Sequence, residues 1–200
     1  MIDDRALIEG YLEGDTNSFN RLAWKWQDKL YRFSYRYLMN EDDAKEAVQM
    51  ALIKVYKNLK KLNDPDRFSS WIFQIQVNIC KDMLKHPNRK KFVSINRELD
   101  NEDGRPIANL DRFADEQDLD YDVHRTNIEE IVKKTLSQIP EEQRVVIIMK
   151  EYQGLKFKEI AEILECPINT VKSRMYYGLQ QMHKILTKLN ISREVLFNEM

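Results

Sequence analysis

A group of polar residues near the C-terminal end of the sequence is well suited to contact another molecule. It contains amide, hydroxyl and cationic side chains within six positions, namely Asn169, Thr170, Lys172, Ser173 and Arg174. Amides and hydroxyls bond base edges, and cations bind phosphate. From Cys166 to Asn190 the sequence has four Lys and Arg residues and no acid, whereas a solvated helical face usually mixes both signs. This pattern indicates contact with DNA.

Two short helices are expected to position this group. Phe157, Ile160, Ala161 and Leu164 recur at helical spacing. Gly154 suits the end of the preceding helix, and the Cys166-Pro167 break separates the two helices because the residue before a proline avoids helical backbone angles. The second helix has an apolar stripe of Val171, Met175, Leu179 and Met182. The pattern predicts a helix-turn-helix, whose second helix lies in the DNA major groove. The alternative is an ordinary helical hairpin in a bundle.

The composition favours an all-α protein. Its 200 residues permit one large or two small domains, and 42% are hydrophobic, which is enough for packed cores. Cys80 and Cys166 stand far apart, so they predict neither a metal site nor a disulfide framework. No apolar run is long enough to cross a bilayer, and the acidic start lacks the cations of a signal peptide. We therefore expect a cytoplasmic location without membrane insertion.

The charges are segregated along the chain. The net charge of −1 excludes a generally basic nucleic-acid coat, so contact with DNA must use local charge. Six Lys and Arg and one acid occur in 81–97, and ten acids with two Arg occur in 98–122. We predict two helical domains, 1–91 and 126–200, joined by an acidic linker at 92–125, with the helix-turn-helix in the second. The linker is either a solvated tether or a segment with a specific role.

Three helices are predicted at the start of the first domain. A short one at about 4–13 has Leu7, Ile8, Tyr11 and Leu12 on its apolar face and ends at Gly14. A long one follows, capped from within Asp15 to Ser18, and a third is capped by Asn40. The core stripe of the long helix is Phe19, Leu22, Ala23, Trp26, Leu30, Phe33 and Tyr37, and that of the third is Val48, Leu52, Val55 and Leu59.

A loop at 60–68 and a helix at 69–86 have the residue types of a platform for single-stranded DNA. One helical face carries Trp71, Gln74, Asn78 and Lys81. Rings stack on unpaired bases, amides bond base edges, and cations contact phosphate. Trp71 is equally well explained as a core residue.

The sequence contains no pattern typical of an enzyme. It has no glycine-rich phosphate loop and no nucleophile elbow. The three histidines, His86, His124 and His183, are scattered. We therefore predict no catalytic residue, no metal site and no cofactor.

The sequence resembles bacterial RNA polymerase sigma factors of the extracytoplasmic-function (ECF) group over nearly its whole length. The most specific segments are Ile139–Met175 and EDDAKEAVQMALIKVYKNL at 41–59. The resemblance implies a promoter-specificity subunit whose first domain binds core polymerase and the −10 element and whose second domain binds the −35 element. The implied partners are core RNA polymerase, promoter DNA and an anti-sigma factor.

The resemblance also implies roles for particular residues. Contact with core polymerase falls to Asp43, Glu46 and Gln49. The −10 element would be bound by a base-capturing loop and the helix after it. The residues implied there are Asn63, Asp64, Arg67, Phe68, Trp71, Gln74, Asn78 and Lys81. The −35 element falls to Asn169, Thr170, Lys172, Ser173, Arg174 and Tyr177.

Two sites in the sequence depart from the pattern of this group, and the linker is also longer than is usual for it. Met50 stands where a carboxylate is common, and Tyr177-Gly178-Leu179 replaces an Arg-Ala-Arg-like run. The second departure removes two cations from the recognition helix. A stand-alone helix-turn-helix regulator, which would bind duplex DNA unaided as a dimer, is the alternative function. A helical adaptor that binds only protein is a third.

Overall fold

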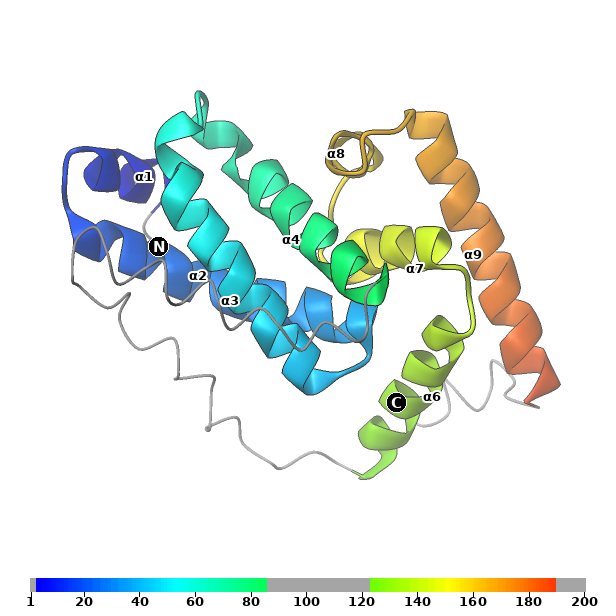
Figure 1. The fold of residues 1–200 in the computed structure, drawn as a ribbon. Coiled ribbons are helices and arrows are strands. Elements are labelled where there is room, and N and C mark those ends of the chain that lie inside the picture. The colour runs from blue at the N-terminus through cyan, green and yellow to red at the C-terminus, as the bar shows by residue number, and fades with distance from the viewer. Residues whose placement is uncertain (1–2, 86–122, 190–200) are drawn as a thin grey trace. The chain divides into compact units, whose positions relative to one another are not determined.

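The computed structural model describes residues 3–85 and 123–189 of the 200-residue chain (Figure 1). The chain divides into two compact units. The described residues are helical, and no strand occurs among them. The predicted all-α fold is therefore confirmed. Within the described ranges, no helix is long and apolar enough to cross a membrane.

The described part of the first unit, residues 3–85, is a bundle of four α-helices. Its elements are α1 Asp4–Leu12, α2 Thr16–Leu38, α3 Glu41–Asn58, the 3-10 turns η1 Leu59–Lys61 and η2 Pro65–Arg67, and α4 Phe68–Lys85. The predicted caps are present: the Asn17 N–H donates to Asp15 Oδ1 at 2.9 Å, and the Asp43 N–H donates to Asn40 Oδ1 at 2.9 Å. Gly14 has φ +105°, so it ends α1 as expected.

The apolar stripes of α2 and α3 form the core of this unit. All seven predicted core residues of α2 and all four of the third stripe are buried. A cluster of rings joins α1, α2 and α3, with ring centroids 5.5 Å apart for Tyr11 and Phe19 and 5.0 Å apart for Phe19 and Tyr56. Leu12 was expected on the apolar face of α1 but is 45% exposed, because α1 buries only Leu7 and Ile8.

A buried polar contact lies between α2 and α4. Gln76 Nε2 donates to Ser34 Oγ at 2.6 Å, and both side chains are fully buried. The Cys80 thiol lies beside them, with Sγ 3.7 Å from Ser34 Oγ. Buried polar groups usually have hydrogen-bond partners. The Gln76 nitrogen has one in Ser34, which links α4 to α2, whereas Gln76 Oε1 has none among the described residues.

Within residues 123–189, the second unit contains four α-helices and one π-helical segment. Its elements are α6 Val123–Ser137, α7 Glu141–Ile147, the π-helical segment η3 Ile148–Tyr152, α8 Phe157–Ile163 and α9 Ile168–Lys188. Gly154 has φ +66° and closes the segment after η3. The predicted core residues Val145, Val146, Ile148 and Met149 are all buried.

The predicted helix-turn-helix corresponds to α8 and α9. The turn between them includes Glu165, which has φ +51°, and Pro167 directly precedes α9. Leu179, predicted on the buried stripe of α9, is 46% exposed. The buried stripe instead runs from Val171 and Met175 to Gly178. A Cβ atom on Gly178 would lie 2.7 Å from Ile147 Cδ1, so α7 and α9 approach closely there.

Most of the predicted acidic linker lies outside the described residues, as does the sequence from 190 to 200. The domain limits 1–91, 92–125 and 126–200 therefore stay a prediction. Helix α6 begins at Val123, inside the predicted linker.

Candidate nucleic-acid interface

The N-terminal turns of α9 carry the polar group found in the sequence. Asn169, Lys172 and Ser173 are exposed, and Thr170 is partly exposed. The Ser173 hydroxyl donates to the Thr170 carbonyl at 2.9 Å, which keeps it close to the helix. Exposed side chains on the second helix of a helix-turn-helix are in the position that reaches base edges.

Arg174 lies beside this group but is already bound within its own unit. Its Nη2 lies 2.7 Å from Glu142 Oε2, and its side chain is 24% exposed against 71% for Glu142. Its Nη1 also lies 3.8 Å from Cys166 Sγ. The guanidinium therefore links the first turn of α7 to α9, and a phosphate would compete with Glu142 for it.

Two tyrosines extend the exposed surface of α9. Tyr176 is 64% exposed and Tyr177 is 55% exposed, with ring centroids 5.5 Å apart. Tyr176 is seven residues after Asn169 and therefore lies on the same helical face. Tyr176 is absent from the residues expected at the −35 element, although this spacing would have identified it.

In the first unit, α4 presents the predicted row of polar and aromatic residues. Asn78 is exposed, while Trp71, Gln74 and Lys81 are partly exposed. The ring centroid of Trp71 lies 6.0 Å from that of Phe68. Trp71 therefore contacts the core and remains accessible, so both explanations offered for it stay compatible with the structure. The row runs over eleven residues, from Trp71 to Lys81, which is about 15 Å along the helix.

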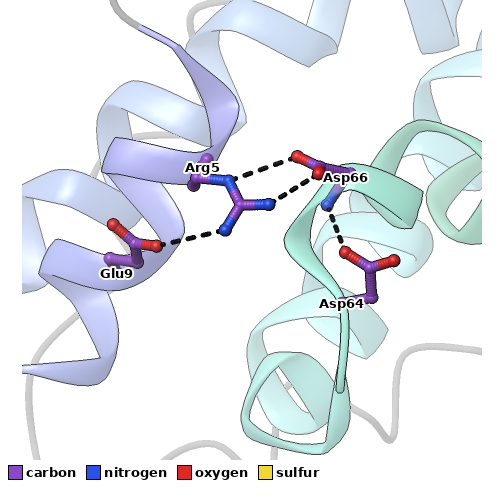
Figure 2. Close-up of polar contacts among 4 residues, drawn as sticks. All are labelled: Arg5, Glu9, Asp64 and Asp66. Carbon is purple, nitrogen blue, oxygen red and sulfur yellow. Dashed lines mark hydrogen bonds and ion pairs between the residues drawn. The ribbon is translucent and has the colours of Figure 1, made fainter.

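The loop before α4 is more ordered than a plain loop. Asp64 caps η2, because its Oδ1 accepts from the Asp66 N–H at 3.0 Å (Figure 2). Asn63 and Arg67 are exposed. Phe68 is only 1% exposed and packs edge-on against Trp26, with centroids 5.6 Å apart. Its ring is covered in this structure, so we withdraw Phe68 as a direct DNA contact and regard it as a support for the loop.

The polar residues of α3 include one carboxylate with an altered pKa. Asp43 is exposed, and Glu46 and Gln49 are partly exposed. Burial, and then the neighbouring charge of Asp43, raise the pKa of Glu46. Met50 is only 8% exposed. At this departure from the common carboxylate, the chain extends its apolar core instead of its polar surface.

Two protein-family models match this chain. Sigma-70 region 2 matches residues 22–90, and sigma-70 region 4 matches residues 129–182. The first match covers the candidate surfaces on α3, η2 and α4, and the second covers the helix-turn-helix. The matched segments together make up more than half of the chain, and they define a sigma-70-type sigma factor.

Comparison with similar proteins identifies the group of sigma factors to which the chain belongs. The chain is 30% identical over 176 residues to the ECF RNA polymerase sigma-E factor of Escherichia coli strain K12, covering 88% of this chain and 90% of that protein. It is 29% identical over 189 residues to that of Haemophilus influenzae (94% and 98%), and 28% over 186 residues to the RNA polymerase sigma-H factor of Pseudomonas aeruginosa (93% and 95%). The chain belongs to the ECF group of bacterial sigma factors.

Two solved structures share the fold. CnrH in complex with the cytosolic domain of CnrY matches with a TM-score of 0.65 at 21% identity, covering 92% of this chain and 97% of that one. The sigma factor RpoE from Bartonella quintana, in complex with the anti-sigma factor NepR, matches with a TM-score of 0.59 at 21% identity, covering 86% and 98%.

The function of the protein follows from its membership in this family. It directs core RNA polymerase to specific promoters and aids strand opening at the start of transcription. Sigma factors are generally non-catalytic initiation factors that bind DNA. The stand-alone regulator considered from the sequence is not favoured.

Proposed function

We propose that the two units divide promoter recognition between them, the first binding core polymerase and the −10 element and the second binding the −35 element. The observation that carries this proposal is the order of the family matches: region 2 falls on the first helical unit and region 4 on the second. The domain limits 1–91, 92–125 and 126–200 are part of the proposal, as are a cytoplasmic location and the lack of any catalytic activity.

On this proposal, α3 contacts core polymerase through Asp43, Glu46 and Gln49. A partly buried carboxylate beside another acid is poorly stabilised in the free chain. Because burial and Asp43 both raise the pKa of Glu46, a cation on the polymerase surface would favour its charged form. Met50 leaves the contact one carboxylate short of the common pattern.

The −10 element would lie along the row on α4, with one flipped base held by the loop before it. Trp71 stacks on a base, Gln74 and Asn78 bond base edges, and Lys81 contacts phosphate; Asn63, Asp64 and Arg67 form the loop. The first unit thereby binds separated strands better than paired ones, and this difference in affinity shifts the equilibrium towards open DNA.

The −35 element would be bound in the major groove by Asn169, Thr170, Lys172, Ser173, Arg174 and Tyr177. We add Tyr176, because it lies on the exposed face that begins at Asn169. The two tyrosines supply contact area, and Tyr177 stands at one of the two positions where a cation is common. We also propose that this chain has an anti-sigma partner, since one structural neighbour was solved with NepR, an anti-sigma factor.

The first test is binding to core RNA polymerase, followed by strand opening on the same sample. Promoters are selected by the holoenzyme from a randomised duplex pool, and unpaired thymines are detected with permanganate. We expect a stable complex that opens DNA which core polymerase alone leaves closed. Trp71→Ala should weaken opening by about fivefold or more, because stacking of one base contributes ~1–3 kcal/mol.

Trp24→Ala is the matched control. Trp24 also lies in the first unit and is 60% exposed, but it belongs to no predicted contact surface, so opening should be unchanged. Circular dichroism checks that Trp71→Ala remains folded. Equal opening by both variants would remove Trp71 from the −10 surface. Specific binding of duplex DNA by a dimer of the free protein, without a polymerase complex, would contradict the proposed function as a whole.

A further inference from the structure

Helix α1 has no role in the function proposed so far. It ends at Leu12, so it lies before the segment matched by sigma-70 region 2, which begins at residue 22. Its Arg5 side chain nevertheless reaches the turn η2, beside the loop proposed to capture a base (Figure 2). Its partner there is Asp66, which lies 61 positions after Arg5 in the sequence.

The contact between Arg5 and the turn is bidentate. Arg5 Nε donates to Asp66 Oδ1 at 3.2 Å, and Nη2 donates to Asp66 Oδ2 at 2.6 Å. A third nitrogen, Nη1, lies 3.7 Å from Glu9 Oε1 on α1 itself. Two parallel bonds to one carboxylate fix direction as well as distance. Arg5 therefore restrains the orientation of the Asp66 side chain.

Further bonds carry this restraint into the loop backbone. The Asp66 N–H donates to Asp64 Oδ1 at 3.0 Å, and the Arg67 N–H donates to the Asp64 carbonyl at 3.0 Å. At the end of the turn, the buried ring of Phe68 packs on Trp26. Both acids of the loop thus have internal partners. Asn63 is exposed and makes no hydrogen bond to any described residue, so its amide is available for a ligand.

Helix α1, which carries Arg5, is anchored to the rest of the first unit. Leu7 and Ile8 are buried at 4% and 0% exposure. On the other side of Arg5, Asp4 Oδ1 lies 2.7 Å from Lys25 Nζ of α2. A side chain on an anchored helix loses less freedom when it binds than one on a mobile segment.

We propose that Arg5 is a positioning residue for base capture, which acts through Asp66 to hold the loop so that the Asn63 amide meets the edge of the flipped base. This inference rests on the proposed role of the loop at the −10 element. The loop must keep its shape when no base is bound, and the Arg5–Asp66 contact maintains that shape. Amide donors and acceptors suit the edge of an unstacked base.

A positioning role for Arg5 and a simple effect of its charge predict different results for the same variants. If Arg5 only neutralised acids near the DNA, Arg5→Gln would weaken binding equally for all sequences, and Asp66→Asn would strengthen it. A positioning role predicts that both variants lose base preference at one −10 position, and that Asn63→Ala loses it at the same position. The reversed pair, Arg5→Asp with Asp66→Arg, should restore it.

The experiment uses holoenzyme rebuilt from the full-length chain and core polymerase. Open complexes are selected from duplexes randomised across the −10 region, and base preference is read by sequencing. We expect Arg5→Gln and Asp66→Asn to reduce preference at one position by about two- to fivefold, the size of effect available to an exposed ion pair. Affinity for core polymerase and the melting temperature should stay at wild-type values.

Glu9→Gln is the control, because it removes the other acid next to Arg5 without touching the turn. An unchanged base preference in Arg5→Gln and Asp66→Asn would overturn the inference while leaving the proposed function intact. A uniform loss of affinity without a change in preference would also overturn it. If wild-type holoenzyme opened no DNA, the proposed function would fail and this inference with it.

Discussion

Arg174 and Glu142 form an ion pair on the surface proposed to meet the −35 element. Their atoms are 2.7 Å apart, although Glu142 is 71% exposed. Exposed pairs contribute little to stability, about 0–1 kcal/mol, so the pair can exchange for a phosphate or base contact at small cost. Glu142 thus limits how freely Arg174 binds DNA.

We therefore predict opposite effects for the two partners. Arg174→Ala should weaken holoenzyme binding to the selected promoter by ~1–3 kcal/mol, the usual cost of a lost bidentate contact. Glu142→Gln should strengthen it by up to about 1 kcal/mol, because it frees the guanidinium and removes a negative charge near phosphate. Titration of fluorescent duplex at several salt concentrations measures both.

Glu141→Gln is the control for this pair of variants, since it makes the same change of charge in the same first turn of α7, whereas the ion pair of Arg174 is with Glu142. Weaker binding by Glu142→Gln would mean that Glu142 orients Arg174 for DNA and does not restrain it. Unchanged binding by Arg174→Ala would exclude Arg174 from the −35 surface.

Cys80 gives the first unit a dependence on alkaline pH. Burial raises the pKa of its thiol from 9.0 to about 12. The unfolded chain therefore loses this proton at lower pH than the folded chain. The stabilisation is complete below pH 9 and is lost as pH rises towards 12, because the folded state then binds more protons than the unfolded state.

Urea unfolding at pH 8 and pH 10 tests this assignment. Between these values the wild type should lose about 1 kcal/mol more stability than Cys80→Ala, since one pKa unit corresponds to about 1.4 kcal/mol. Comparing the two proteins cancels the titration of tyrosine and lysine. Parallel losses would show that the Cys80 thiol ionises normally in the folded state.

Among the elements, the contact between α7 and α9 depends on Gly178. A Cβ there would lie 2.7 Å from Ile147 Cδ1 and 3.2 Å from Gln143 Cβ. The first neighbour is the flexible end of a side chain and can move. Alanine would also gain helix propensity of about 1 kcal/mol over glycine. A larger side chain would push the helices apart.

The free energy of unfolding of Gly178→Ala should therefore stay within about 1 kcal/mol of the wild-type value. The higher helix propensity of alanine offsets the cost of the small shift of Ile147. Gly178→Leu should lose roughly 1–3 kcal/mol through overpacking. Urea unfolding of the full chain followed by circular dichroism measures both. Equal stability of the two variants would mean that α7 and α9 do not pack closely at Gly178.

The helices were predictable where the sequence carries a repeated local signal. The stripes of α2 and α3, the caps Asp15 and Asn40, and the glycines at 14 and 154 all have such signals. The π-helical segment at 148–152 has none, and the left-handed backbone of Met39 and Glu165 falls on residues that rarely adopt it. Tertiary packing imposes the π-helical segment and the two left-handed residues, so no local sequence pattern predicts them.

At the scale of the whole molecule, charge explains why recognition is shared with a partner. A net charge of −1 provides little general attraction to DNA. Arg174 also has an internal acid partner, and Tyr177 and Leu179 replace two common cations. We infer that the affinity of the complete complex for DNA depends on polymerase as well as on this chain.

The candidate surfaces were predictable as sets, but their internal contacts were not. Spacing alone placed Trp71, Asn78 and Lys81 on one helical face, and it placed the polar start of α9. It did not indicate that Phe68 would be covered by the core or that Arg174 would find Glu142. Such contacts join residues far apart in sequence, and only the packed unit brings them together.

The anchoring of α1 has a practical consequence for dissecting this protein into fragments. A fragment that begins at residue 22, where the region 2 match begins, would lack Phe19 and the Tyr11 ring that packs on Tyr56. It would also leave the Asp66 carboxylate without Arg5. Such a fragment would expose part of its core to solvent and present a loosened loop to DNA. Fragments intended for binding studies should therefore retain α1.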